Sequence, residues 1–329
     1  MKERPVFVTG ASQTGKSLLA RLLKSRSNIA FFTQEDRFWQ RFYGEFGDLS
    51  RQENFDRCFD AFIQYSRGLG FEHDEASLHQ VLSQRPRSYI ELYASIQEDY
   101  ARQAGRPRWG AHSDGPQVYA ESILQRFSGA KFIHIIRDPR DRWVNMKNPT
   151  GTQPAGLKKL GRIGADLGAW LRSVDHAEKN RKRFPDAYMV LPFESMVCEP
   201  VETMRRICDF IDAPDSSPDR RDISRDEFGL LAKHLDCQDV TAEFVGFYRS
   251  KIPPREVAYI QRQAGVVMER LGYELDSINL SAIEQVRLNF VDRCVNFTRQ
   301  QAGHVLRRRT ESRRALALSG PNADVVHTT

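Results

Sequence analysis

The chain has 329 residues, of which 40% are hydrophobic and 28% charged, as in an ordinary globular protein. Its formal net charge of +6 is modest and suits an anionic ligand better than extensive nucleic-acid binding. No apolar run reaches the roughly 18 residues of a membrane span, and no signal-like segment precedes the first predicted strand. Five scattered cysteines without a C-x-x-C pair indicate reduced thiols, so we expect a cytoplasmic protein without a zinc site.

The first predicted element is a phosphate-binding loop. Residues 5–9 form a short β-branched run, residues 10–17 read G-A-S-Q-T-G-K-S, and residues 18–23 are mostly apolar. This strand, glycine loop and helix match the pattern G-x-x-x-x-G-K-[ST], in which backbone N–H groups and a helix N-terminus bind phosphate and a lysine adds charge. The sequence therefore predicts a phosphorylated ligand here.

A second short apolar run, residues 28–32, is followed by two acids, Glu35 and Asp36. A strand in this position ends at the carboxyl edge of the sheet beside the phosphate loop, where open α/β sheets bind ligands. Both acids are candidate ligand contacts, and the alternative that they are solvated loop acids stays open.

Residues 41–108 carry aromatic and aliphatic side chains at helical spacing and contain no strand-like run. They predict a helical insertion that covers one side of the ligand site and whose aromatic residues form core. Residues 109–116 are predicted as a turn-rich stretch, followed by a helix over residues 117–127.

The most apolar predicted strand, residues 131–136, runs into Arg137-Asp138-Pro139. Pro139 suits the first turn of a helix and Asp138 can cap it, so we expect Arg137 to project from the strand end as a ligand-facing cation. The alternative that the charged residues of this junction are solvated surface stays open. Residues 146–164 are predicted as a loop, and a helix follows with Leu167 and the apolar residues after it on one face.

Further elements are a strand at 188–191, a helix at 200–211, a loop at 214–227 and a helix at 255–271. This order predicts a parallel sheet surrounded by helices. A last helix begins at the capping box of Ser281 and Glu284 and leads to an arginine-rich tail. Its apolar face consists of Ile283, Val286, Phe290, Cys294 and Phe297. We expect that face to dock on the domain, with a second subunit or an anionic surface as alternatives.

Four stretches of the chain resemble the sulfotransferases that use 3′-phosphoadenosine 5′-phosphosulfate (PAPS). Residues 10–19 resemble the loop for the 5′-phosphosulfate, and residues 131–145 resemble the 3′-phosphate segment with its R-D-P motif. Residues 190–214 and 245–274, the latter ending in L-G-Y-E, resemble two further segments. The resemblance implies a P-loop NTPase-like α/β domain over residues 1–275 and a C-terminal helical appendage over 276–329.

The resemblance also implies which residues bind the cofactor. The loop would cradle the 5′-phosphosulfate, Arg137 and Asn145 would bind the 3′-phosphate, and two cations near the end of the domain would clamp it. Asn145 stands where the family usually has serine. Gln13 stands where the family usually has a cation, and Lys16 could supply that charge instead. The implied cofactor-binding residues are Ser12, Gln13, Thr14, Gly15, Lys16, Ser17, Arg137, Asn145, Arg249 and Lys251.

The implied reaction moves a sulfuryl group to a hydroxyl or amine and leaves adenosine 3′,5′-bisphosphate (PAP), without a metal. Glu35 corresponds to the general base of the carbohydrate-type branch, which would take the acceptor proton, and Asp36 is the fallback for this role. Lys16 would neutralise the leaving phosphate, and His112 is a candidate contact to the acceptor or the sulfuryl group. The acceptor could be a small molecule, a carbohydrate or a lipid, and no nucleic acid is expected.

Two alternatives remain open. A P-loop kinase or NTPase would use Ser17 to bind Mg²⁺ and Asp138 as the acid at a strand end. A non-catalytic relative is suggested by Gln13, Asn145 and the basic C-terminal helix.

Overall fold

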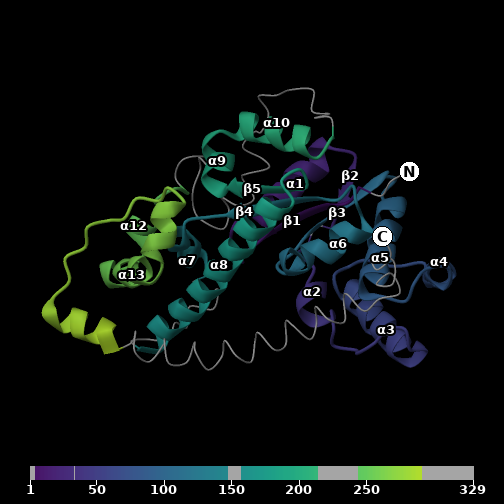
Figure 1. Ribbon diagram of the computed structural model, residues 1–329, viewed down its shortest axis with the longest axis horizontal. Coiled ribbons are helices and arrows are strands. Elements are labelled where there is room, and N and C mark those ends of the chain that lie inside the picture. The colour runs from purple at the N-terminus through teal and green to yellow at the C-terminus, as the bar shows by residue number, and fades with distance from the viewer. Residues whose placement is uncertain (1–3, 33, 147–156, 214–243, 291–329) are drawn as a thin grey trace, which may run out of the picture.

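The computed structural model describes residues 4–32, 34–146, 157–213 and 244–290. Five parallel strands form one sheet in the order β2-β3-β1-β4-β5. Figure 1 shows the sheet enclosed by helices. The strands are β1 (Val6–Gly10), β2 (Ile29–Phe31), β3 (Arg108–His112), β4 (Lys131–Ile136) and β5 (Tyr188–Pro192). The predicted P-loop NTPase-like α/β class is confirmed.

The strand β3 corrects the prediction of a turn-rich stretch over residues 109–116. It inserts between β2 and β1, with Val6 opposite Gly110 and Val8 opposite His112. Gly110 suggests a turn in the sequence, yet it leaves room for the ring of Phe31, which a side chain at this position would strike. Close packing of β2 on β3 therefore explains a glycine inside a strand.

Alternating side chains of the strands enter two cores. Val6 and Val8 of β1 and Ile133 of β4 pack under α1 (Lys16–Arg26), α9 (Phe193–Cys198) and α10 (Pro200–Phe210). Phe7 and Phe132 point to the opposite face, where their rings stack at 4.8 Å. This alternation fixes the register of β1 against its neighbours.

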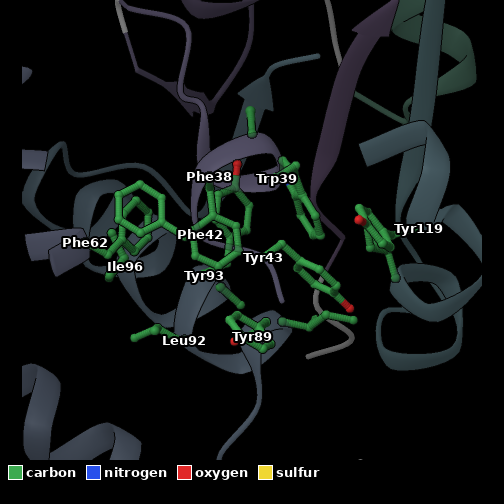
Figure 2. Packing of buried hydrophobic residues seen from close by; sticks show 14 of the residues in the cluster. Phe38, Trp39, Phe42, Tyr43, Phe62, Tyr89, Leu92, Tyr93, Ile96 and Tyr119 are labelled. Atoms are coloured by element: carbon green, nitrogen blue, oxygen red, sulfur yellow. The ribbon is translucent and has the colours of Figure 1, made fainter. Parts of the chain in front are cut away.

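The predicted helical insertion, residues 41–108, contains α3 (Gln52–Gly68), α4 (Glu75–Ser83) and α5 (Tyr89–Gln103), and the short helix α2 (Phe38–Arg41) leads into it. Their aromatic side chains form one buried cluster with Tyr119 of η1 (Pro116–Tyr119), the turn that leads into α6 (Ala120–Arg126) (Figure 2). Phe38, Phe62 and Tyr93 lie at its centre, with ring centroids 4.7 and 4.8 Å from Phe38. These aromatics are core, as predicted.

A third core lies where α7 (Pro139–Asn145), α8 (Leu157–Arg183), α12 (Tyr248–Lys251) and α13 (Pro254–Arg270) meet. The expected face of α8 is confirmed, because Leu167, Trp170, Val174 and Ala177 are buried. The helix begins earlier than predicted, so residues 157–164 are helical and not loop. Residues 147–156 and the predicted loop at 214–227 lie outside the described residues.

The last described helical residues are 282–290. The capping box is present, since Ser281 Oγ donates to Glu284 Oε2 at 2.8 Å. The predicted docking face is wrong: Ile283, Val286 and Phe290 are 66%, 67% and 57% exposed. Among residues 282–290, Leu288 is instead the buried one. Cys294, Phe297 and the arginine-rich tail lie outside the described residues.

Candidate functional site

The phosphate loop joins β1 to α1 and is shaped by two glycines. Gly10 has a φ of +145°, and a side chain there would strike the carbonyl oxygen of Ile135. Gly15 has a φ of +95°, and a Cβ atom would lie 2.5 Å from the ring of Phe193. The helix α1 starts at Lys16 with no side-chain cap and no acid in its first turn. Its N–H groups are therefore available to an anion.

Lys16 turns back across the loop into a pair of acids. Its Nζ lies 2.5 Å from Oδ1 of Asp114 and 3.5 Å from Oε1 of Glu35, and it donates to the Ala11 carbonyl at 3.0 Å. Ser12 Oγ donates to Asp114 Oδ2 at 2.8 Å. The backbone N–H of Asp114 donates to Glu35 at 3.1 Å. One cation of the loop is thus shared by two carboxylates from the ends of β2 and β3.

The two acids of this cluster differ in basicity. Burial raises the pKa of Glu35, although the charge of Lys16 opposes it. Burial would also raise the pKa of Asp114, but the charge and hydrogen bond of Lys16 outweigh it, and that pKa is lowered. Asp114 is therefore the ionised partner of Lys16, and Glu35 is the better proton acceptor.

His112, at the end of β3, is 2% exposed beside this cluster. Burial and the charges of Lys16 and Arg21 lower its pKa to about 4, so the ring is neutral at pH 7. Neither ring nitrogen has a hydrogen-bond partner within the described part of the chain. A buried polar group of this kind is suited to a ligand that supplies the partner.

Asp36 does not reach the cluster. Its carboxylate accepts hydrogen bonds from Tyr93 Oη at 2.8 Å and from the Phe38 N–H at 3.1 Å, inside the aromatic core. Its backbone carbonyl accepts from Ser113 Oγ at 2.8 Å and so joins the ends of β2 and β3. Asp36 is a structural residue that positions its neighbour Glu35, which leaves Glu35 as the candidate base.

Arg137 follows β4 on the other side of the loop and is 3% exposed. Its guanidinium lies 4.1 Å from the ring centre of Phe193, the ring that backs Gly15. It donates at 3.4 Å to the carbonyls of Gln13 and Phe244, and its Nε has no partner among the described residues. Burial lowers its pKa.

The helix α7 ties this side of the site to the loop. Arg142 donates to the Ser12 carbonyl at 2.5 Å and pairs with both carboxylate oxygens of Asp166 in α8. Asn145, the last residue of α7, is half-buried and lies one turn after Arg142, on the same side of the helix. Its side chain is therefore on the face of α7 that meets the loop.

The two predicted clamp cations lie in α12. Arg249 pairs with Asp276 at 2.9 Å, and Lys251 Nζ lies 5.0 Å from the ring centre of Phe247. Within the described ranges no hydrogen bond or ion pair joins Arg249 to Arg137 or to the loop. Arg249 lines a cavity of about 410 Å³ at the carboxyl ends of β4 and β5. Their role in cofactor binding stays a prediction.

The remaining residues predicted for the phosphate loop are Gln13, Thr14 and Ser17. Thr14 is buried and donates to the Ala11 carbonyl at 2.8 Å. Gln13 has a φ of 64°, and its carbonyl accepts from Arg137 while its side chain is exposed. Ser17 is half-buried in the first turn of α1. Within the described ranges no group of three or more His, Cys, Asp or Glu could hold a metal ion.

Three residues of this site were not predicted from the sequence: Asp114, Phe193 and Arg142. Asp114 is the first residue of the sequence D-G-P, which predicts only a turn. Had β3 been recognised, Asp114 would have been placed at the carboxyl edge of the sheet beside the loop.

The parallel sheet and the glycine loop after β1 define a P-loop protein. A model of the sulfotransferase family matches residues 5–217, well over half of the chain, and the chain belongs to that family. No curated protein sequence matches it. None of the helices in the described ranges is both long and apolar enough to span a membrane.

Solved structures of sulfotransferases are similar to this chain. A sulfotransferase domain from the Synechococcus PCC 7002 olefin synthase is 19% identical, with a TM-score of 0.47, and the match covers 84% of this chain and 98% of that one. A sulfotransferase domain from the curacin biosynthetic pathway is 17% identical, with a TM-score of 0.48 and coverage of 83% and 99%. Mouse sulfotransferase SULT7A1 complexed with PAP is 12% identical, with a TM-score of 0.46 and coverage of 88% and 90%.

Proposed function

We propose that this protein moves the sulfuryl group of PAPS to a hydroxyl or amine of an acceptor and leaves PAP. The observation that carries the proposal is the buried guanidinium of Arg137, which lies beside the phosphate loop without a carboxylate in ion-pair contact among the described residues. A buried cation is costly unless an anion compensates it, and a nucleotide 3′-phosphate would do so. Membership of the sulfotransferase family supports the same donor.

The donor would be held from two sides of the loop. The N–H groups at the start of α1 and the Nζ of Lys16 would hold its 5′ end, and Arg137 with Asn145 would hold the 3′-phosphate. Because Gln13 carries no charge, Lys16 is the cation of the loop. When bound, the donor supplies a sulfuryl group whose bond to the bridging phosphate oxygen breaks as the acceptor atom bonds to sulfur.

Glu35 would take the proton of the acceptor. Its carboxylate lies 3.5 Å from Lys16 Nζ, and its pKa is raised by burial, as a general base at a transfer site requires. Asp114 keeps Lys16 paired and donates its backbone N–H to Glu35, which orients the base. The neutral ring of His112 can donate with one nitrogen and accept with the other, which suits contact with the acceptor or the sulfuryl group.

The acceptor would approach from the ends of β2 and β3, under the helical insertion. The sequence resemblance leaves a small molecule, a carbohydrate or a lipid as the proposed acceptor, and at this edge Glu35 follows β2 and His112 ends β3. The aromatic cluster of the insertion is closed core, so it supports the pocket and does not select the acceptor.

A kinase or NTPase would need Asp138 as a metal ligand. That carboxylate caps α7 and forms a two-point ion pair with Arg140, with Nε to Oδ1 at 3.0 Å and Nη2 to Oδ2 at 2.7 Å. A carboxylate committed to a buried arginine is a poor ligand for Mg²⁺. This contact favours the sulfotransferase over the kinase.

Thermal stabilisation of the purified chain by PAP tests the proposal, with ATP in the presence and absence of Mg²⁺ for comparison. A ligand at a hundred times its Kd adds about 2.7 kcal/mol to the free energy of unfolding. We expect a shift with PAP and its loss in Arg137→Ala. Arg183→Ala is the matched control, since its pair with Glu121 is exposed and far along α8.

A shift with Mg-ATP alone would contradict the proposal and favour the kinase. Binding of PAP without turnover of any acceptor in a screen with PAPS would favour a non-catalytic relative. Turnover that is lost in Glu35→Gln would complete the case for transfer.

A further inference from the structure

The ammonium group of Lys16 is surrounded by oxygen atoms of the protein itself. Lys16 is the one charged residue in the sequence of the loop, residues 10–17. Its Nζ lies 2.5 Å from Oδ1 of Asp114, 3.0 Å from the Ala11 carbonyl and 3.5 Å from Oε1 of Glu35. An ammonium group has three N–H donors, and three oxygens face them. An oxygen of a bound phosphate can therefore reach Lys16 only if one of these contacts gives way.

Asp114 contacts the loop as a bound anion would. One carboxylate oxygen, Oδ1, faces Lys16, and the other, Oδ2, accepts from the hydroxyl of Ser12 at 2.8 Å. Ser12 and Lys16 are both residues that the sequence predicts for the 5′ end of the donor. The charge of Lys16 also lowers the pKa of Asp114, which keeps the carboxylate ionised. An internal anion thus engages two groups that the donor would use.

The exposure of these side chains indicates which contact can give way. Lys16 is only 3% exposed, whereas the side chains of Glu35 and Asp114 are 32% and 30% exposed. A buried ammonium group is costly without an anion, so Lys16 requires a negative partner throughout. The two carboxylates can be hydrated when Lys16 leaves them. The exchange that costs least therefore replaces a carboxylate by the anion of a ligand.

We propose, on the basis of the function proposed above, that Asp114 competes with the donor for Lys16, and that the 5′ end of the donor takes the lysine from Asp114. The exchange needs only rotation of the Lys16 side chain, because its Nζ already donates to a carbonyl of the loop. Lys16 also contacts Glu35, and its charge lowers the pKa of that carboxyl against the effect of burial. Glu35 therefore becomes a stronger base once the donor has taken the lysine.

Calorimetric titration of Asp114→Asn with PAP tests the competition. Asparagine can still accept from the Ser12 hydroxyl, but it forms no ion pair with Lys16. The Kd for PAP should fall by about tenfold, because hydrogen bonds to charged groups are the strong ones. Asp209→Asn is the matched control, since this carboxylate pairs with Arg205 on the exposed surface of α10. The Kd of that variant should equal the Kd of wild type.

A double-mutant cycle with Lys16→Met separates competition from a general effect of charge. Loss of a negative charge near the loop favours any anion, whether or not Lys16 is present, whereas competition requires the lysine. We expect Asp114→Asn to change the Kd for PAP by at most about twofold in the Lys16→Met background. A tenfold gain in both backgrounds would overturn the proposal.

An unchanged Kd for PAP in Asp114→Asn would also overturn the proposal. So would a higher Kd, which would mean that Asp114 places Lys16 for the donor. Asp114→Ser likewise lacks the charge and should give the same gain as Asp114→Asn, and the melting temperatures of both variants show whether they are folded.

Inorganic pyrophosphate is the second probe, because it can bind a phosphate loop without the rest of the nucleotide. Tighter pyrophosphate binding in Asp114→Asn, together with no binding of PAP to wild type, would support the competition and reject PAPS as the donor. No gain with either probe would reject the competition.

Discussion

At the scale of single residues, Asp36 positions the candidate base although its side chain does not contact the phosphate loop. Asp36 is buried in the aromatic core, and its backbone carbonyl joins the ends of β2 and β3. It thereby fixes the direction of Glu35 beside it. Burial raises the pKa of Asp36 from 3.8 to about 7. The carboxyl is therefore partly protonated at neutral pH.

This shift predicts how stability changes with pH. The native state binds the Asp36 proton more tightly than the unfolded state, so the contribution of Asp36 to stability is full below about pH 4 and declines as the pH rises to about 7. The slope reaches at most about 1.4 kcal/mol per pH unit. Urea unfolding of wild type and Asp36→Asn across this range measures it.

In Asp36→Asn the decline between about pH 4 and about 7 should be absent, and the variant should gain on wild type as the pH rises. An amide can still accept from the Phe38 N–H and donate to Tyr93 Oη, so the fold should persist. Parallel stability curves for the two proteins would show that Asp36 does not titrate in this window.

The charged residues at the strand ends and in the loop could be predicted from the sequence, but the ion pairs that they form could not. Glu35, Lys16 and Arg137 stand out because each follows an apolar run or lies in the glycine loop. That Asp114 holds Lys16 could not be foreseen, because β3 is short, contains a glycine and has no apolar run. Recognising it requires the packing of Phe31 against Gly110, which is a tertiary contact.

At the scale of elements, the ion pair of Arg142 and Asp166 connects α7, α8 and the loop. Arg142 is 1% exposed and also donates to the Ser12 carbonyl. Removing one partner of a buried pair leaves an uncompensated charge, which costs about 3–5 kcal/mol. We expect Asp166→Ala to lower the free energy of unfolding by this amount and to weaken PAP binding, since Ser12 belongs to the loop.

The same helix provides the control. Asp175 pairs with Lys179 at 2.8 Å, and both side chains are more than half exposed. An exposed pair one turn apart contributes at most about 0.5 kcal/mol. Urea unfolding should therefore separate Asp166→Ala clearly from Asp175→Ala. Equal, small losses would mean that Arg142 finds another partner.

The early start of α8 illustrates why this element was mispredicted. Gly161 and Gly164 and the preceding prolines suggest a loop over residues 146–164. Leu160 and Ile163 are buried in the core with α13, and their burial outweighs the poor helix propensity of the glycines. Propensity summed over a short window cannot detect a partner helix that is about a hundred residues away in sequence.

At the scale of the whole molecule, the sheet order places the proposed acceptor side and the proposed donor side of the candidate site on opposite sides of β1. The loop of β1 lies in the middle, β3 and β2 carry His112 and Glu35 on one side, and β4 carries Arg137 on the other. The apolar runs of the sequence predicted β1, β2, β4 and β5, but not β3, the strand that carries His112. They also could not predict that Ile283, Val286 and Phe290 are exposed, because an apolar helix face has the same spacing whether it packs on a core or faces outward.

This division predicts that acceptor-side and donor-side substitutions separate kinetically. Glu35→Gln removes the proposed proton acceptor, so kcat should fall by about 10²–10⁴-fold for any acceptor found in a screen. The Kd for PAP should change little, because Glu35 lies across Lys16 from Arg137. Arg137→Ala should have the opposite effect: it should raise the Kd for PAP, as measured by calorimetric titration. His112→Asn should resemble Glu35→Gln, with a smaller loss of kcat.

A different result would reassign the role of Glu35. If Glu35→Gln weakened the binding of PAP as strongly as Arg137→Ala, then Glu35 would act by placing Lys16 on the donor. The base would then have to be sought at Asp114, the other carboxylate that contacts this lysine.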